Sequence, residues 1–170
     1  FEKERGVTEA DYLEMVRGKT AALIGFTAWL GGLAAERDDS ILSTLYHFGE
    51  NLGLAFQMQD DLLGIWGDPA VTGKSAASDL MSKKKTLPVL YGLVHSPEFR
   101  SMWQEELTSS EKVSQMTEVL KTCGAMESVR DQAKFFTEKA FTILKGLFSQ
   151  RNDYAKAIFE LTASLLQRDF

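Results

Sequence analysis

Two adjacent aspartates, Asp60 and Asp61, lie in the most apolar part of a segment with helical periodicity. Neighbouring carboxylates repel each other, and a buried, ionised carboxylate without a partner is strongly destabilising. The pair therefore indicates a nearby cation. Mg²⁺ is the simplest one, because proteins typically hold it with one or two carboxylates, phosphate oxygens and water. The alternative is a solvated pair, or ion pairs with Lys and Arg of neighbouring helices.

Helical geometry gathers further residues around this pair. At 100° per residue, one stripe about 100° wide contains Gln57, Asp60, Asp61 and Gly64, and also Asp68 if the helix or its last turn reaches that residue. The flanking positions are leucines and aromatic residues, so this stripe does not resemble a solvated face. A second pair, Asp38-Asp39, lies at a predicted helix start, where capping explains it, and we assign it no function.

Three lysines could complement an anion at this site. Lys19 lies on or beside the apolar stripe of its segment, which favours a partly buried ammonium next to a carboxylate or phosphate; a side chain that reaches the surface is the alternative. Lys74 follows Gly73, but Asp68 occupies the position where a P-loop requires glycine, so this is no P-loop. Lys74 could close over a diphosphate as a loop lysine or remain solvated. Lys84, in the run Lys83–Lys85, has the same two interpretations.

The elements that must position these residues are predicted to be helices throughout, because the chain has three prolines and no alternating apolar pattern. A helix is expected from Thr8 to about Arg37, and another from about Ile41 to Trp66 that ends before Pro69. A polar loop is expected over residues 68–78. Another helix is expected over roughly Pro88–His95. Weaker amphipathic patterns predict helices near Pro97–Leu107, Ser110–Thr122, Ala125–Gln150 and Asn152–Arg168.

Composition narrows the class of protein. The 170 residues have 44% hydrophobic content, which predicts a single domain over residues 1–170. The net charge of −5, without a basic patch, argues against nucleic acid as a partner. Cys123 is the only cysteine, which suggests a reducing, cytoplasmic location. The longest uncharged stretch, residues 20–35, is shorter than a membrane span, so no transmembrane helix is expected.

The sequence around the aspartate pair resembles the second aspartate-rich region of trans-prenyl (polyprenyl) diphosphate synthases. The resemblance covers about residues 8–95. Lys19-Thr20 is similar to the Lys-Thr pair that lies across the active-site cavity in those enzymes. The other matching segments are Phe56–Leu63, Gly67-Asp68, Gly73-Lys74, Asp79-Leu80 and Lys84–Pro88.

The resemblance implies an antiparallel helical bundle of the isoprenoid synthase type, of which this chain would be the C-terminal half. In that family, two facing aspartate-rich motifs bind three Mg²⁺ ions around an allylic diphosphate, which ionises to an allylic cation. Isopentenyl diphosphate then attacks the cation, and a longer prenyl diphosphate results. Metals and lysines stabilise the departing diphosphate, which is electrostatic catalysis.

The resemblance also assigns roles at the matching positions. Asp60 would be a direct ligand of Mg²⁺, and Asp61 a ligand or a supporting partner behind it. Lys19 and Asp60 would be the catalytic residues. The diphosphate would be contacted by Lys19, Lys74 and Lys84. The site near the reacting carbons would be lined by Thr20, Phe56 and Gln57.

This chain departs from the family pattern at two positions and lacks one motif. Gly64 stands where the common Asp-Asp-x-x-Asp motif has its third aspartate, which leaves Asp68 as a substitute ligand or supporting acid. Lys83 stands where glycine is usual. Nothing in the 170 residues resembles the first aspartate-rich motif, and the chain begins at Phe1 rather than Met. We therefore expect it to be part of a larger protein, inactive alone.

Two alternatives stay open beside a chain-elongating prenyltransferase. A terpene synthase or an irregular prenyl-coupling enzyme would share the scaffold and the metal-assisted ionisation. A non-catalytic subunit of a heteromeric synthase would share the scaffold alone. The active protein is expected to be a homodimer, or to be completed by a segment or chain that carries the first motif. The residues that usually set product length lie near that motif and are not in this sequence.

Overall fold

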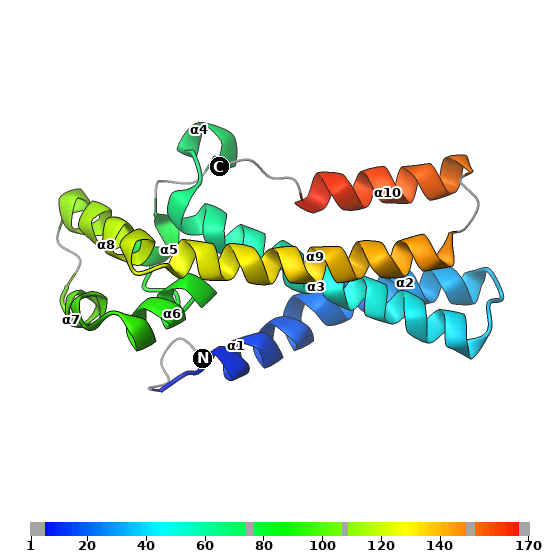
Figure 1. Cartoon of the computed structure of the whole chain (residues 1–170), viewed down its shortest axis with the longest axis horizontal. Coiled ribbons are helices and arrows are strands. Elements are labelled where there is room, and N and C mark those ends of the chain that lie inside the picture. The colour runs from blue at the N-terminus through cyan, green and yellow to red at the C-terminus, as the bar shows by residue number, and fades with distance from the viewer. Residues whose placement is uncertain (1–5, 74–76, 107–108, 149–151, 167–170) are drawn as a thin grey trace. The chain divides into compact units, whose positions relative to one another are not determined.

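A computed structural model describes residues 6–73, 77–106, 109–148 and 152–166 (Figure 1). All regular elements in these residues are helical, which confirms the all-α prediction. The elements are α1 (Glu9–Val16), the π-helical turn η1 (Arg17–Ala21), α2 (Ala22–Ala34), α3 (Asp39–Trp66), α4 (Pro69–Thr72), α5 (Ser78–Met81), α6 (Leu87–His95), α7 (Pro97–Gln104), α8 (Ser110–Thr122), α9 (Ala125–Leu147) and α10 (Asp153–Leu166).

The helix boundaries follow from local chemistry and match most of the predicted ones. Asp38 caps the start of α3 by accepting a hydrogen bond from the Ile41 N–H at 3.0 Å. The expected helix over 8–37 consists of α1, η1 and α2 in succession, because a π-helical turn interrupts it. The prediction of a polar loop over residues 68–78 is wrong in one respect, since this segment contains the short helix α4. Pro69 begins that short helix at a position where proline is favourable.

The chain divides into two compact units, which we describe separately. In the described residues, unit 1 comprises residues 6–12 and 58–131, and unit 2 comprises residues 13–57 and 132–166. The division passes through α1, α3 and α9, so each of these helices contributes to both units. The single domain expected from composition stays a prediction.

Unit 1 is built around a core of buried apolar side chains. Figure 1 shows α6, α7 and α8 gathered together, and these helices contact one another. Their core is joined by Ile65 at the end of α3 and by Leu80 of α5. Leu80, Val89 and Phe99 are fully buried. Burial of these side chains fixes the ends of α3 and α5, which carry the acids considered below.

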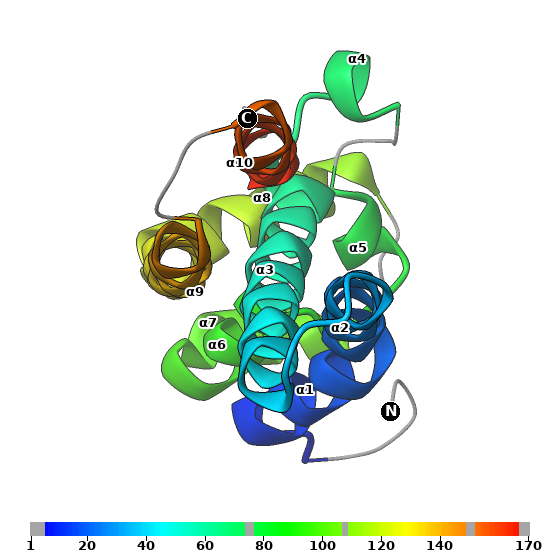
Figure 2. The same cartoon turned by 90° about the vertical axis from the view of Figure 1, so that its right-hand side faces the viewer.

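In unit 2, α2 runs along the first part of α3, as Figures 1 and 2 show. Both α2 and η1 approach α3 closely. A Cβ at Gly49 would lie 2.7 Å from the Cα of Gly25, and one at Gly53 would lie 2.6 Å from the Cα of Ala21. No real side chain fits at those distances, so glycine is required here. The contact at Ala21 sets the position of η1, and with it Thr20, against α3.

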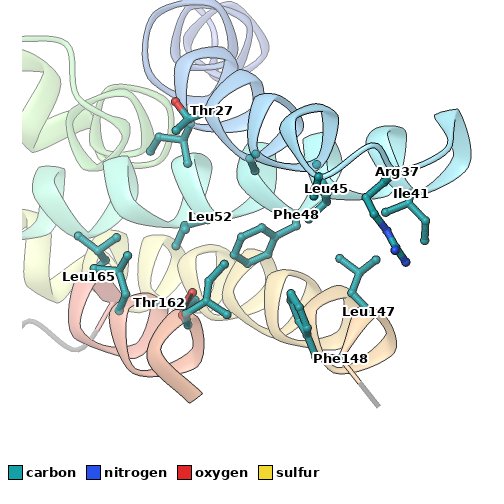
Figure 3. Close-up of a pocket in the computed structure, with 17 residues that line it drawn as sticks. Thr27, Arg37, Ile41, Leu45, Phe48, Leu52, Leu147, Phe148, Thr162 and Leu165 are labelled. Atoms are coloured by element: carbon teal, nitrogen blue, oxygen red, sulfur yellow. Dashed lines mark hydrogen bonds between the residues drawn. The ribbon is translucent and has the colours of Figure 1, made fainter. Parts of the chain in front are cut away.

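A cavity of about 730 Å³ opens in unit 2, between apolar residues of α2, α3, α10 and the end of α9. Figure 3 shows Phe48 and Leu52 of α3 on one side, with Thr162 and Leu165 of α10 on the other. None of the residues assigned to the site from sequence lines it. In the described part of the chain, no helix has the length and hydropathy that a membrane crossing requires.

Candidate active site

Asp61 is buried in unit 1 and is held by two protein donors. The residue is only 3% exposed to solvent. Its Oδ2 accepts a hydrogen bond from the Tyr12 hydroxyl at 2.6 Å and another from the Leu87 N–H at 2.9 Å. Leu87 is the first residue of α6, so its N–H has no partner within that helix. Asp61 therefore connects the starts of α1 and α6 to α3.

Tyr12 remains a hydrogen-bond donor to Asp61 at any ordinary pH. Burial raises the pKa of the Tyr12 phenol far above its usual value, and the negative charge of Asp61 and the hydrogen bond to it raise the pKa further. The charges of Asp60 and Asp79 act in the same direction. Sequence reasoning missed Tyr12, because nothing in the local pattern pairs it with a residue 49 positions away.

Asp60 differs from its neighbour in exposure. Asp61 is buried, whereas Asp60 is only partly buried and can be approached from solvent. Among the described residues, no three His, Cys, Asp or Glu side chains are arranged to hold a metal ion. Carboxylates are ligands that Mg²⁺ accepts from proteins, with phosphate oxygens and water as its other ligands. Asp61 Oδ2 is engaged by two donors, and the roles of both acids toward a metal stay predictions.

Asp79 and Lys84 form an ion pair in the same unit. Asp79 is 4% exposed, and its Oδ1 accepts a hydrogen bond from Lys84 Nζ at 2.6 Å. This hydrogen bond raises the pKa of Lys84, and the charges of Asp79, Asp60 and Asp61 raise the pKa further. Lys84 is therefore a charged lysine in the field of three acids, rather than one more residue of a solvated run.

Unit 2 brings together two of the predicted site residues. The Thr20 hydroxyl donates a hydrogen bond to Gln57 Oε1 at 3.2 Å. Thr20 and Lys19 belong to η1, in which the N–H of Ala22 bonds to the carbonyl of Arg17 five residues earlier. Such π-helical turns are frequent at functional sites. Lys19 is exposed, which favours the second of the two interpretations that the sequence left open, a side chain that reaches solvent.

Two predicted site residues remain, Phe56 and Lys74, and the structure describes only the first of them. Phe56 is partly buried on α3, one residue before Gln57. Lys74 lies outside the described residues. The roles assigned to these side chains stay predictions.

The family-model comparison matches residues 1–123 to the model described as polyprenyl synthetase. The match covers more than half of the chain. The chain belongs to the polyprenyl synthetase family. The family predicted from the residues around Asp60 is therefore confirmed, and the matched range contains every site residue discussed above.

Individual family members agree with this assignment. The geranylgeranyl diphosphate synthase of Mycobacterium tuberculosis is 54% identical over 93 residues, which cover 55% of this chain and 27% of that protein. The geranylgeranyl diphosphate synthase of Saccharolobus solfataricus is 31% identical over 173 residues, which cover 99% of this chain and 52% of that protein. The chain thus spans about half the length, or less, of the curated relatives it matches.

A solved structure of a polyprenyl synthetase relative supports the helical fold. The crystal structure of geranylgeranyl pyrophosphate synthase from Corynebacterium glutamicum, complexed with isoprenyl diphosphate and magnesium, matches with a TM-score of 0.80 and 30% identity. The match covers 92% of this chain and 47% of that one. The predicted fold, a helical fold of the isoprenoid synthase type, is confirmed.

Asp68 follows the polyprenyl synthetase motif and was a candidate to replace its third acid. The residue is exposed, and its Oδ1 accepts a hydrogen bond from the Ala70 N–H at 2.8 Å. Asp68 is therefore the N-cap of α4. This capping role explains the residue at that position, and a role toward a metal stays a prediction.

Lys83 occupies the position where the family resemblance gives glycine, and the backbone shows why glycine is usual there. Its φ is +53°, in the left-handed region that disfavours side chains. Lys83 nevertheless makes favourable contacts. Its Nζ donates to the carbonyls of Trp103 at 2.6 Å and Glu105 at 2.9 Å, and it lies 4.8 Å from the centre of the Trp103 ring.

These opposing effects give a stability prediction. Lys83→Gly loses the contacts to Trp103 and Glu105 but relieves the left-handed backbone, whereas Lys83→Ala loses the same contacts and keeps the strain. We expect the Gly variant to be more stable than the Ala variant by about 1 kcal/mol. Urea unfolding of both variants measures the difference. An Ala variant as stable as the Gly variant would show that the backbone at this position carries no strain.

Proposed function

We propose that this chain is the C-terminal half of a Mg²⁺-dependent trans-prenyltransferase, which condenses an allylic diphosphate with isopentenyl diphosphate into a longer prenyl diphosphate. The observation that carries the proposal is the pairing of an approachable acid, Asp60, with a buried acid, Asp61, that Tyr12 and Leu87 hold in place. An acid fixed in this way is suited to present its neighbour to a metal–diphosphate complex.

The names of the relatives support the same chemistry. They include geranylgeranyl, farnesyl and geranylfarnesyl diphosphate synthases. One related crystal structure contains isoprenyl diphosphate with magnesium, and another contains isoprenyl diphosphate with calcium. All of these ligands combine a diphosphate with a divalent cation, which is the combination that suits an incomplete carboxylate site.

In the proposed mechanism, each residue acts on the diphosphate or on the carbon that it leaves. Asp60 holds Mg²⁺, which when bound neutralises charge on the departing diphosphate. Lys84 donates an N–H group to a phosphate oxygen and stabilises the negative charge that develops as the carbon–oxygen bond breaks. The family resemblance gives Lys19 and Lys74 the same role. The oxygens of Thr20 and Gln57, joined by a hydrogen bond, stabilise positive charge on the allylic carbons.

An exposed apolar surface supports completion of the site by further protein. On α2, Leu23 is 67% exposed, Phe26 52%, Leu30 47% and Leu33 45%. These residues recur three or four positions apart, so they share one face of the helix. A contiguous apolar face of this kind indicates contact with protein. We infer that it packs against the segment or chain that carries the first aspartate-rich motif, within a homodimer or in a larger polypeptide.

A product assay tests the proposed function. The intact protein is incubated with Mg²⁺, geranyl or farnesyl diphosphate and isopentenyl diphosphate, and we expect a linear prenyl diphosphate that is longer by at least one isoprene unit. Chelation of the metal should stop the reaction. A cyclic or branched product would indicate the terpene synthase or irregular coupling alternative. Turnover only after addition of a second synthase chain, and unaffected by Asp60→Asn, would indicate a non-catalytic subunit.

A further inference from the structure

Gly64 of α3 is buried directly beneath the carboxylate of Asp79. A Cβ placed on Gly64 would overlap Asp79 Oδ2 and would lie 2.6 Å from Asp79 Cγ and 3.3 Å from Oδ1. Real Cβ atoms do not approach other atoms so closely, so the carboxylate rests on bare helix backbone. Position 64 is the one at which the family resemblance gives a third aspartate on α3.

The backbone at Asp79 cannot move away from Gly64, because the core holds α5 in place. The next residue, Leu80, is fully buried in the core of unit 1. Ala77, just before α5, is also buried there and has a left-handed backbone with φ of +51°. A residue that adopts this conformation without being glycine is held by its surroundings. Asp79 is thus fixed from one side by the core and from the other by α3.

Asp79 also forms an ion pair that orients Lys84. Asp79 Oδ1 accepts the hydrogen bond from Lys84 Nζ at 2.6 Å, while the Lys84 side chain is 49% exposed and can meet an anion from solvent. An ammonium has three N–H donors, and Asp79 takes one of them. A buried acid that is paired with a half-exposed lysine orients the lysine without being accessible itself.

We propose that Asp79, seated on Gly64, acts as the positioning residue for Lys84. In this chain Gly64 provides the space that the Asp79 carboxylate occupies. The inference rests on the proposed function, in which Lys84 binds the diphosphate.

The proposal predicts that Gly64 and Asp79 are coupled. Gly64→Ala pushes the Asp79 carboxylate away and breaks its bond to Lys84, and Asp79→Ala breaks the same bond directly. Each change should weaken binding of an allylic diphosphate by about 10-fold or more, the size expected for loss of one charge-assisted hydrogen bond. The double variant should bind no more weakly than Asp79→Ala alone, because the clash is gone.

Two measurements test this coupling in the intact protein. Binding of geranyl S-thiolodiphosphate, an unreactive substrate analogue, is titrated in the presence of Mg²⁺. Independently, proton–nitrogen NMR of the lysine ammonium groups reports the Lys84–Asp79 bond, since a short ion pair slows proton exchange. The Lys84 signal should disappear in Gly64→Ala, Asp79→Ala and Asp79→Asn. Loss of this signal with unchanged binding would overturn the role of Asp79 in the site.

Gly92→Ala is the matched control, because it crowds the side chains of Leu120 and Phe99 in the same unit without touching Asp79. Its effects should add to those of Asp79→Ala. If Gly64→Ala alone fails to fold, recovery of folding in the double variant gives the same evidence for contact between the two residues. Asp79→Asn then still measures how much the charge of Asp79 contributes to diphosphate binding. Additive effects of Gly64→Ala and Asp79→Ala would contradict the proposal. Because the NMR signal requires no turnover, the test of the Lys84–Asp79 bond is independent of the product assay that tests the proposed function.

Discussion

Asp60→Asn is expected to lower kcat by about 1,000-fold or more while leaving the fold intact. Asn keeps the size of the side chain and one oxygen but removes the negative charge that holds the metal against the diphosphate. Asp60 is partly buried, and the hydrogen bonds that organise unit 1 around Asp61 do not depend on its charge. The loss should therefore appear in steady-state turnover and not in the unfolding transition.

The chain supplies a control for this variant. Asp39→Asn removes the same charge from the same helix, at its exposed first residue. Turnover of the Asp39 variant should stay near that of the unchanged protein. An Asp60→Asn protein that retains turnover within about 10-fold would contradict the catalytic assignment.

Asp61→Ala is expected to affect stability as much as activity. It leaves the Tyr12 hydroxyl and the Leu87 N–H buried without their acceptor, which should lower the free energy of unfolding by about 3 kcal/mol. Asp61→Asn should cost less, because its amide oxygen can still accept both hydrogen bonds. Urea unfolding, followed by circular dichroism, measures both variants.

Tyr12→Phe measures how much of this stability comes from one of the two donors to Asp61. It removes one donor to Asp61 while Leu87 still donates, so the loss of stability should be smaller than in Asp61→Ala. An Asp61→Ala protein as stable as the unchanged one would show that Asp61 does not connect α1 and α6 to α3.

Local chemistry in the sequence predicted the helices well. Asp38 was recognised as a cap, and Pro69 as the end of a long helix, because both effects depend only on neighbouring residues. The π-helical turn η1 was not predicted, since its apolar period differs little from that of an α-helix over one turn. The exposure of Lys19 was one of two interpretations left open, because periodicity shows which face a residue occupies and not how far its side chain extends.

The candidate site was only half visible in the sequence. Asp60 and Asp61 could be found from their apolar surroundings, and the resemblance named their family. Tyr12 could not be found, and Asp79, although part of a matching segment, could not be assigned a contact, since the contacts of these residues with Asp61 and Gly64 depend on how distant segments pack. The functional meaning of Gly64 likewise required the position of α5. Contacts of this kind are decided by tertiary structure, and no local pattern encodes them.

The most direct test of the account is whether Asp60 makes diphosphate binding depend on Mg²⁺. Calorimetric titration of geranyl S-thiolodiphosphate is carried out on the unchanged protein and on Asp60→Asn, each with Mg²⁺ and with EDTA. We predict that Mg²⁺ tightens binding to the unchanged protein by about 100-fold or more and tightens binding to the variant far less. Equal tightening by Mg²⁺ in both proteins would mean that Asp60 does not hold the metal.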